Sequence, residues 1–157
     1  MDCKQTKSFY EMMHHYLVFY KEFLNFETKK LDDVANNRIK LMDEHVKNEE
    51  VFLLKCRGFE VKRQAFLKEL GLENMLMRDV IKQAPEEMRE QLDSVFSELS
   101  EAILDLKEIN NRCNSMIELR LHKIEKTLNQ LEESKQKSQK GPTKGEKKFT
   151  DFISRKV

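Results

Sequence analysis

The sequence has no tryptophan, four glycines and two prolines among its 157 residues. Glycine and proline supply most tight turns, so this scarcity excludes sandwiches, barrels and alternating βαβ folds. Long apolar runs are also missing, because the longest, residues 16–20, is far too short to cross a membrane. The first residues, MDCKQTKSF, lack the apolar segment of a signal peptide. We therefore expect a cytoplasmic chain without membrane insertion.

Cysteines and catalytic motifs are equally sparse. Cys3, Cys56 and Cys113 are odd in number and widely spaced, so they form neither a disulfide framework nor a Cys-x-x-Cys metal pair. A di-iron bundle needs two Glu-x-x-His motifs, and only Glu11 and His14 form one. The sequence has no glycine-rich phosphate loop, nucleophile elbow or HExxH motif. It predicts no enzyme, no metal and no cofactor.

Charged residues are abundant, at 36% of the chain, and their distribution is uneven. Residues 134–157 carry eight basic side chains against Glu146 and Asp151, which leaves residues 1–133 with a net charge of about −5. An acidic body is not typical of a nucleic-acid-binding domain. We predict a helical bundle domain over residues 1–133 and a flexible basic tail over residues 134–157.

Helical periodicity is clear in the first half of the chain. Residues 6–33 carry seven of the thirteen aromatic side chains, which predicts a helix with a ring-filled core face; an aromatic binding cage is the alternative. Residues 32–37 are rich in turn formers. Residues 38–70 form a second helix, and Gly58 inside it suggests a closely packed neighbour. Gly71 is expected to stop that helix in the left-handed conformation. The second helix has one seam at heptad spacing: Phe52, Cys56, Phe59, Arg63, Phe66 and Leu70.

The rest of the bundle is a short helix over residues 72–83 and one long helix from Pro85 to about Glu133. The predicted fold is therefore all-α: an elongated antiparallel helical bundle of three long helices, with a short helix between the second and third and a disordered C-terminal tail. The last helix would be roughly 70 Å long against roughly 50 Å for the second. Its final 20 Å or so should then extend beyond the bundle.

That extension carries an apolar row of five residues, which predicts a partner groove or a dimer contact. Asn110 lies in the heptad seam of the last helix that this row continues, and Asn114 lies on the adjoining row. An amide at these positions either sets the register or contacts a partner peptide. The predicted row is Ile117, Leu121, Ile124, Leu128 and Leu131. The tail ends in a second apolar group, which is either a short linear motif or a frayed terminus. This group consists of Phe149, Phe152, Ile153 and Val157.

Two stretches have a family resemblance. Residues 61–71, VKRQAFLKELG, resemble the R-x-x-L-L-x-x-L-G end of the second helix in FlgN-type flagellar export chaperones. Residues 104–117, LDLKEINNRCNSMI, are similar to that family's L-x-x-L-N-x-x-N-x-x-L-I stretch in the last helix. Glu27 stands where the family tends to place a glutamate. The aromatic load of the first helix and Cys113 depart from the family pattern.

The resemblance implies a cytosolic chaperone of flagellar type III export. Such a chaperone binds the C-terminal helical region of hook–filament junction proteins, which are hook-associated proteins. It prevents their premature polymerisation and delivers them to an export-gate component. Carried over to this sequence, partner binding falls on Asn110, Asn114 and the row from Ile117 to Leu131. A homodimer is also compatible with that row. The alternatives are a generic coiled-coil adaptor and an injectisome-class secretion chaperone.

Overall fold

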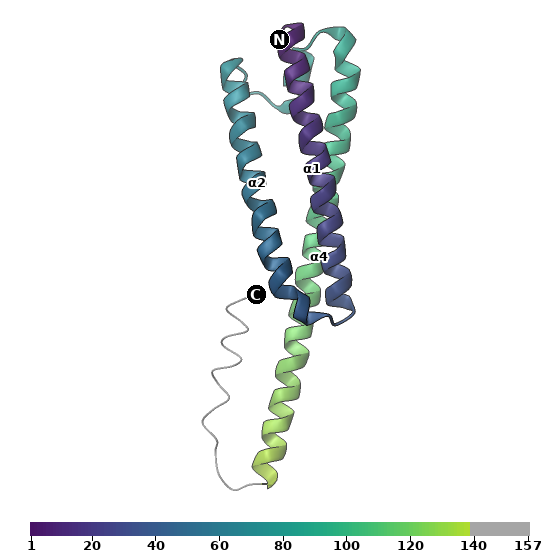
Figure 1. Ribbon diagram of the computed structural model, residues 1–157, viewed down its shortest axis with the longest axis vertical. Helices are drawn as coiled ribbons and strands as arrows, with labels where there is room; N and C mark the ends of the chain where they lie inside the picture. The colour runs from purple at the N-terminus through teal and green to yellow at the C-terminus, as the bar shows by residue number, and fades with distance from the viewer. Residues whose placement is uncertain (139–157) are drawn as a thin grey trace. The chain divides into compact units, whose positions relative to one another are not determined.

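The computed structural model describes residues 1–138, which form helices and turns without any strand (Figure 1). This result confirms the all-α prediction for the described residues. The helices are α1 (Cys3–Ala35), the short 3-10 turn η1 (Ile39–Leu41), α2 (Met42–Glu69), α3 (Met77–Lys82) and α4 (Glu86–Ser138). The chain divides into two compact units, residues 1–113 and residues 114–157, and α4 contributes to both. The predicted division at residue 133 remains a prediction.

Local hydrogen bonds explain where α1 starts and ends. Asp2 Oδ1 accepts from the Gln5 amide at 2.7 Å, and Gln5 Oε1 accepts from the Asp2 amide at 2.9 Å. This reciprocal capping box starts the helix three residues before the predicted position. The helix ends at Ala35, and Asn37 takes the left-handed conformation with φ 60°. The predicted turn within residues 32–37 is thus confirmed, while η1 delays α2 to Met42.

The connection from α2 to α4 differs from the prediction in one element. Gly71 has φ +69°, which confirms the left-handed stop after α2. The short helix α3 covers residues 77–82 only, because Leu76 has extended backbone and is 75% exposed. The buried apolar residues of α3 are Val80 and Ile81. Helix α4 begins at Glu86, one residue after the predicted start at Pro85. It continues to Ser138, five residues beyond the predicted end near Glu133, since no glycine or proline interrupts it.

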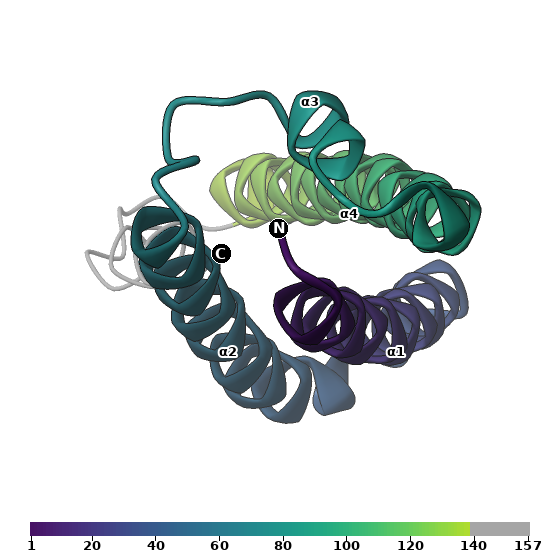
Figure 2. The same ribbon diagram turned by 90° about the horizontal axis from the view of Figure 1, so that it is seen from above.

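Helix α1 lies beside both α2 and α4 in the first unit, as Figures 1 and 2 both show. One face of α1 joins α3, α4 and the end of α2 in an aliphatic core. The fully buried members of this core are Phe9, Met13, Leu17, Leu67, Val80, Ile81, Ala84, Leu92, Val95 and Ala102. Burying each of the larger side chains among them stabilises the unit by roughly 1.5–3 kcal/mol. The core therefore fixes α1 against the first five turns of α4.

The other face of α1 meets α2 through a ladder of aromatic rings. Phe23 and Phe52 stack with centroids 4.7 Å apart and planes within 5°. Phe59 meets Tyr16 at 4.5 Å and Phe19 at 4.7 Å. The Tyr16 hydroxyl also donates to the Phe59 carbonyl oxygen at 2.8 Å. The predicted ring-filled seam is therefore observed as the packing contact of an antiparallel α1–α2 hairpin.

Helix α2 is much less covered than α1. Only His45 and Leu67 are buried along its 28 residues, and the predicted heptad seam is half-buried throughout. Leu54 and Val61 on its outer side are 68% and 65% exposed. A Cβ added at Gly58 would meet no atom within 4 Å in the described residues, so the predicted close neighbour at Gly58 is wrong. Helix α2 is held along one side only.

The open space at Gly58 yields a stability prediction. Gly58→Ala should raise the free energy of unfolding by about 1 kcal/mol, because alanine costs less backbone entropy within a helix and meets no atom. Gly71→Ala is the matched control, since its Cβ is equally unobstructed but its φ of +69° strains an L-residue. It should lower the free energy by about 1–2 kcal/mol. Urea denaturation measures both, and an unchanged or destabilised Gly58→Ala chain would contradict the packing described above.

Candidate binding surfaces

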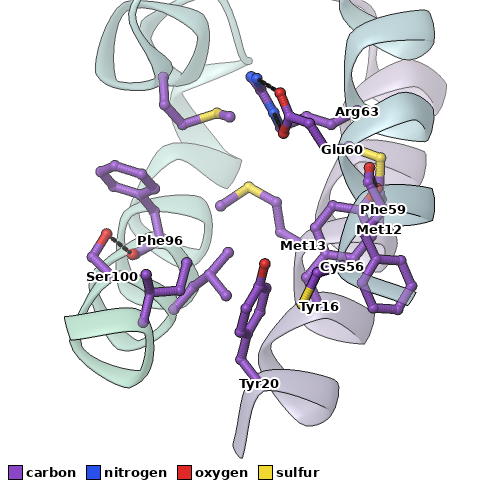
Figure 3. Close-up of a pocket in the computed structure, with 13 residues that line it drawn as sticks. Met12, Met13, Tyr16, Tyr20, Cys56, Phe59, Glu60, Arg63, Phe96 and Ser100 are labelled. Atoms are coloured by element: carbon purple, nitrogen blue, oxygen red, sulfur yellow. Dashed lines mark hydrogen bonds and ion pairs between the residues drawn. The ribbon is translucent and has the colours of Figure 1, made fainter. Parts of the chain in front are cut away.

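A cavity of about 190 Å³ opens between α2 and α4, with α1 as its floor (Figure 3). From α1 and α2 it is lined by Met12, Met13, Tyr16, Tyr20, Cys56, Phe59, Glu60 and Arg63. From α3 and α4 it is lined by Met77, Phe96, Leu99, Ser100 and Ile103. All of these residues belong to the first unit. The cavity exists because the half-covered seam of α2 faces α4 across a space that side chains do not fill.

The cavity is apolar in its depth and charged at one end. Arg63 donates twice to Glu60, at 2.8 Å from Nε and 2.6 Å from Nη2, so this pair satisfies its own charges. Burial raises the pKa of the Cys56 thiol, although a hydrogen bond with Tyr20 opposes the shift. Burial also raises the pKa of the Tyr20 hydroxyl. Both groups are therefore neutral at physiological pH, and the cavity suits an uncharged apolar group.

A second hollow of about 390 Å³ adjoins the cavity along α4 and shares Phe96 and Ser100 with it. Its other lining residues are Arg78, Ile81, Lys82, Arg89, Asp93 and Ser97. Lys82 is paired with Asp79 at 2.7 Å, so Arg78 and Arg89 against Asp93 leave the local charge positive. This hollow therefore favours an anionic group next to the apolar cavity.

The predicted partner-binding residues on α4 differ in exposure. Asn110 belongs to the first unit and is half-buried, whereas Asn114 is exposed. In the second unit, the row Ile117, Leu121, Ile124 and Leu128 is half-buried, and Leu131 is 53% exposed. The described part of that unit, residues 114–138, is a single helical segment. The predicted tail group Phe149, Phe152, Ile153 and Val157 lies outside the described residues.

A buried ionic cluster lies near the α1–α2 turn. Lys30 Nζ is 2.8 Å from Glu49 Oε2 and 3.5 Å from Glu27 Oε2. Burial raises the pKa of Glu27 to about 7, although Lys30 opposes the shift, and Glu27 Oε1 has no hydrogen-bond partner among the described residues. Burial would lower the pKa of Lys30, but Glu49 and Glu27 raise it. Burial also raises the pKa of the nearby Cys113 thiol.

A second set of charges ties the start of α2 to the end of α1. Asp33 Oδ2 lies 2.6 Å from His45 Nε2, and Asp33 Oδ1 accepts from Arg38 Nε at 2.6 Å. The His45 and Arg38 hydrogen bonds lower the pKa of Asp33. These contacts join α1, the loop before η1 and α2, so they fix the geometry of the turn.

Neither charge cluster resembles a metal centre. Within residues 1–138, no group of three or more His, Cys, Asp or Glu side chains is arranged to hold a metal ion. His14 and His15 flank the aromatic face, with His14 stacked on Tyr10 at 6.1 Å and His15 edge-on to Phe59 at 5.5 Å. No helix in the described part of the chain has the length and apolar character needed to cross a membrane.

Comparison with known proteins decides the family. The sequence matches the FlgN protein family over residues 1–145. The chain belongs to the FlgN family. FlgN proteins are chaperones of flagellar assembly and not an enzyme family, and the resemblance seen in residues 61–71 and 104–117 is confirmed. No curated protein and no solved structure matches the chain.

Two features of this FlgN-family chain, the cavity and the ionic cluster, were not among the sequence-based predictions. Phe96, Ser100 and Ile103 of α4 line the cavity, while Val95 and Ala102 on another row of the same helix pack into the core. A single heptad row cannot reveal two packed faces. The ionic cluster was detectable in the sequence, because a glutamate and a lysine three residues apart interrupt the otherwise apolar face of the first helix.

The raised pKa of Glu27 yields a prediction about pH. The folded chain binds this proton more tightly than the unfolded chain, whose glutamate titrates near 4.5. The contribution is complete below pH 4.5 and is lost as pH rises through 7. Glu27→Gln should remove a decline of about 2–3 kcal/mol between pH 5 and pH 8.

Urea denaturation across this pH range measures the effect as the difference between parent and variant. The exposed Glu22 on the same helix supplies the control, because Glu22→Gln should leave the parent's pH dependence intact. Parallel curves for the parent and Glu27→Gln would show that Glu27 is ionised in the folded chain throughout.

Proposed function

We propose that this chain is a cytoplasmic chaperone of flagellar type III export. Its clients would be hook–filament junction proteins, bound by their C-terminal helical regions. Binding keeps those regions from polymerising prematurely, and the chaperone then delivers the client to an export-gate component. The observation that carries this proposal is the FlgN family match, which spans residues 1–145. The helical fold supports it, because a helical client packs readily against exposed helix faces.

The proposed client contact is the apolar row on the second unit. Ile117, Leu121, Ile124 and Leu128 recur at spacings of four and three residues, and Leu131 continues them. A row of this spacing presents one continuous face of a helix, which is the geometry that accepts the apolar face of a partner helix. Burying each large side chain against a client contributes roughly 1.5–3 kcal/mol before the cost of association is subtracted.

The two asparagines would act on the register of the complex. Asn110 is half-buried and Asn114 is exposed on the turn that precedes the row. An amide in an apolar seam costs affinity when it is left without a partner and favours the one register that satisfies it. The pair would therefore select how the client helix is placed along the row, at the expense of some affinity. Weaker binding suits a chaperone that must release its client.

The row makes a sharp test. Changing Leu121, Ile124 and Leu128 to serine should weaken binding of a junction protein's C-terminal region at least about 100-fold, since the variant loses roughly 3 kcal/mol or more of apolar burial. Leu104→Ser with Leu119→Ser is the control, because both leucines are more than half exposed and lie off the row. Titration calorimetry measures affinity, and circular dichroism confirms helicity.

Two outcomes would count against this surface. A triple variant that binds as tightly as the parent would show that the client docks elsewhere. A triple variant that loses its helicity would show that the row belongs to the folded core.

A further inference from the structure

The cavity between α2 and α4 has a volume that matches one large apolar side chain. An apolar cavity of about 150 Å³ in a protein interior accepts benzene, so about 190 Å³ accommodates one phenylalanine, leucine or methionine side chain. Met12, Met13 and Met77 supply flexible thioether side chains to its wall. Methionine surfaces adapt to differently shaped apolar partners. The lining therefore suits an incoming side chain whose identity varies from one client to another.

The surroundings of the cavity indicate a helix as the source of that side chain. Its walls are the half-covered seam of α2 and one row of α4, and both are regular helices. Three helices leave one side of α2 open, and a fourth helix laid there would complete a four-helix arrangement. The fourth helix would insert one side chain between ridges of its neighbours.

Charge narrows the chemistry of the occupant. The adjoining hollow carries Arg78, Lys82 and Arg89 against Asp93. Lys82 already pairs with Asp79 at 2.7 Å, and Arg78 is exposed at the rim. Arg78 and Arg89 against Asp93 leave this hollow with a positive patch. Charge complementarity therefore selects a partner helix with acidic residues as the occupant.

We propose that an acidic amphipathic helix of the export client docks in this groove of the first unit. It places one large apolar side chain in the cavity between α2 and α4. A carboxylate of the same helix faces Arg78, because the hollow lined by Arg78 shares Phe96 and Ser100 with the cavity. This inference rests on the proposed function, since it assigns the same clients a second contact besides the α4 row.

Cys56 provides a native probe of the cavity. The full-length parent is treated with N-ethylmaleimide, with and without a synthetic peptide of a junction protein's C-terminal helix, and each cysteine is followed by peptide mass spectrometry. At ten times its Kd the peptide should slow labelling of Cys56 about tenfold. Labelling of the exposed Cys3 should not change. Calorimetry on the same samples measures whether the peptide binds at all.

The outcomes separate the two proposals. Peptide binding with unprotected Cys56 overturns this inference and leaves the proposed function standing. Failure of any junction-protein peptide to bind overturns both. Protection of Cys56 that rises with chain concentration in the absence of peptide assigns the cavity to a second copy, and that result also overturns the inference.

Matched variants test the two parts of the groove. Ser100→Leu fills the cavity and should weaken peptide binding about tenfold, whereas Ser94→Leu on another side of α4 should not change it. Arg78→Glu should weaken binding several-fold, more strongly at low salt, and Lys107→Glu should have no effect. Equal affinity of Ser100→Leu and the parent would overturn the inference, with unchanged thermal melting confirming that each variant is folded.

Discussion

The ring contacts between α1 and α2 are the interaction on which the open groove of the first unit depends. Helix α2 buries only His45 and Leu67 completely, so it has little aliphatic packing of its own. Phe52 and Phe59 hold it against α1 by stacking and edge-on contacts, each contributing about 0.5–1.5 kcal/mol beyond area burial. Phe59 also lines the cavity, so the contact that attaches α2 to α1 forms part of the cavity wall.

The buried charges at the turn fix the register of α1 against α2, which the ring contacts do not fix. Aromatic contacts tolerate sliding, because a displaced ring still finds apolar surface. Lys30 has no such tolerance, since moving it away from Glu49 would leave a charge buried without its closest partner. The same holds for Asp33 between His45 and Arg38. Desolvation makes these clusters weak contributors to net stability, but they penalise every other alignment of α1 and α2.

Periodicity alone could predict the helices and the ring-filled seam, because amphipathic spacing and scarce turn residues act locally. It could not predict the length of α3, because Leu76 falls within the predicted helix over residues 72–83 but lies exposed on extended backbone. It also could not predict the space beside Gly58, since a glycine within a helix is equally compatible with close packing and with none. The cavity could not be predicted from the sequence for a related reason. A half-buried seam and a fully buried seam have the same sequence pattern, and only tertiary packing distinguishes them.

The uneven burial sets an order of local stability within the first unit. The aliphatic core joins α1, α3 and α4 through fully buried side chains, whereas most of α2 is exposed on its outer side and half-buried on its inner side. Segments with few buried contacts open at a lower free energy than the core. Helix α2 is therefore the wall of the groove whose displacement costs the least free energy. Moving it leaves the core intact. A groove built in this way can widen while α1 and α4 keep its floor and opposite wall fixed.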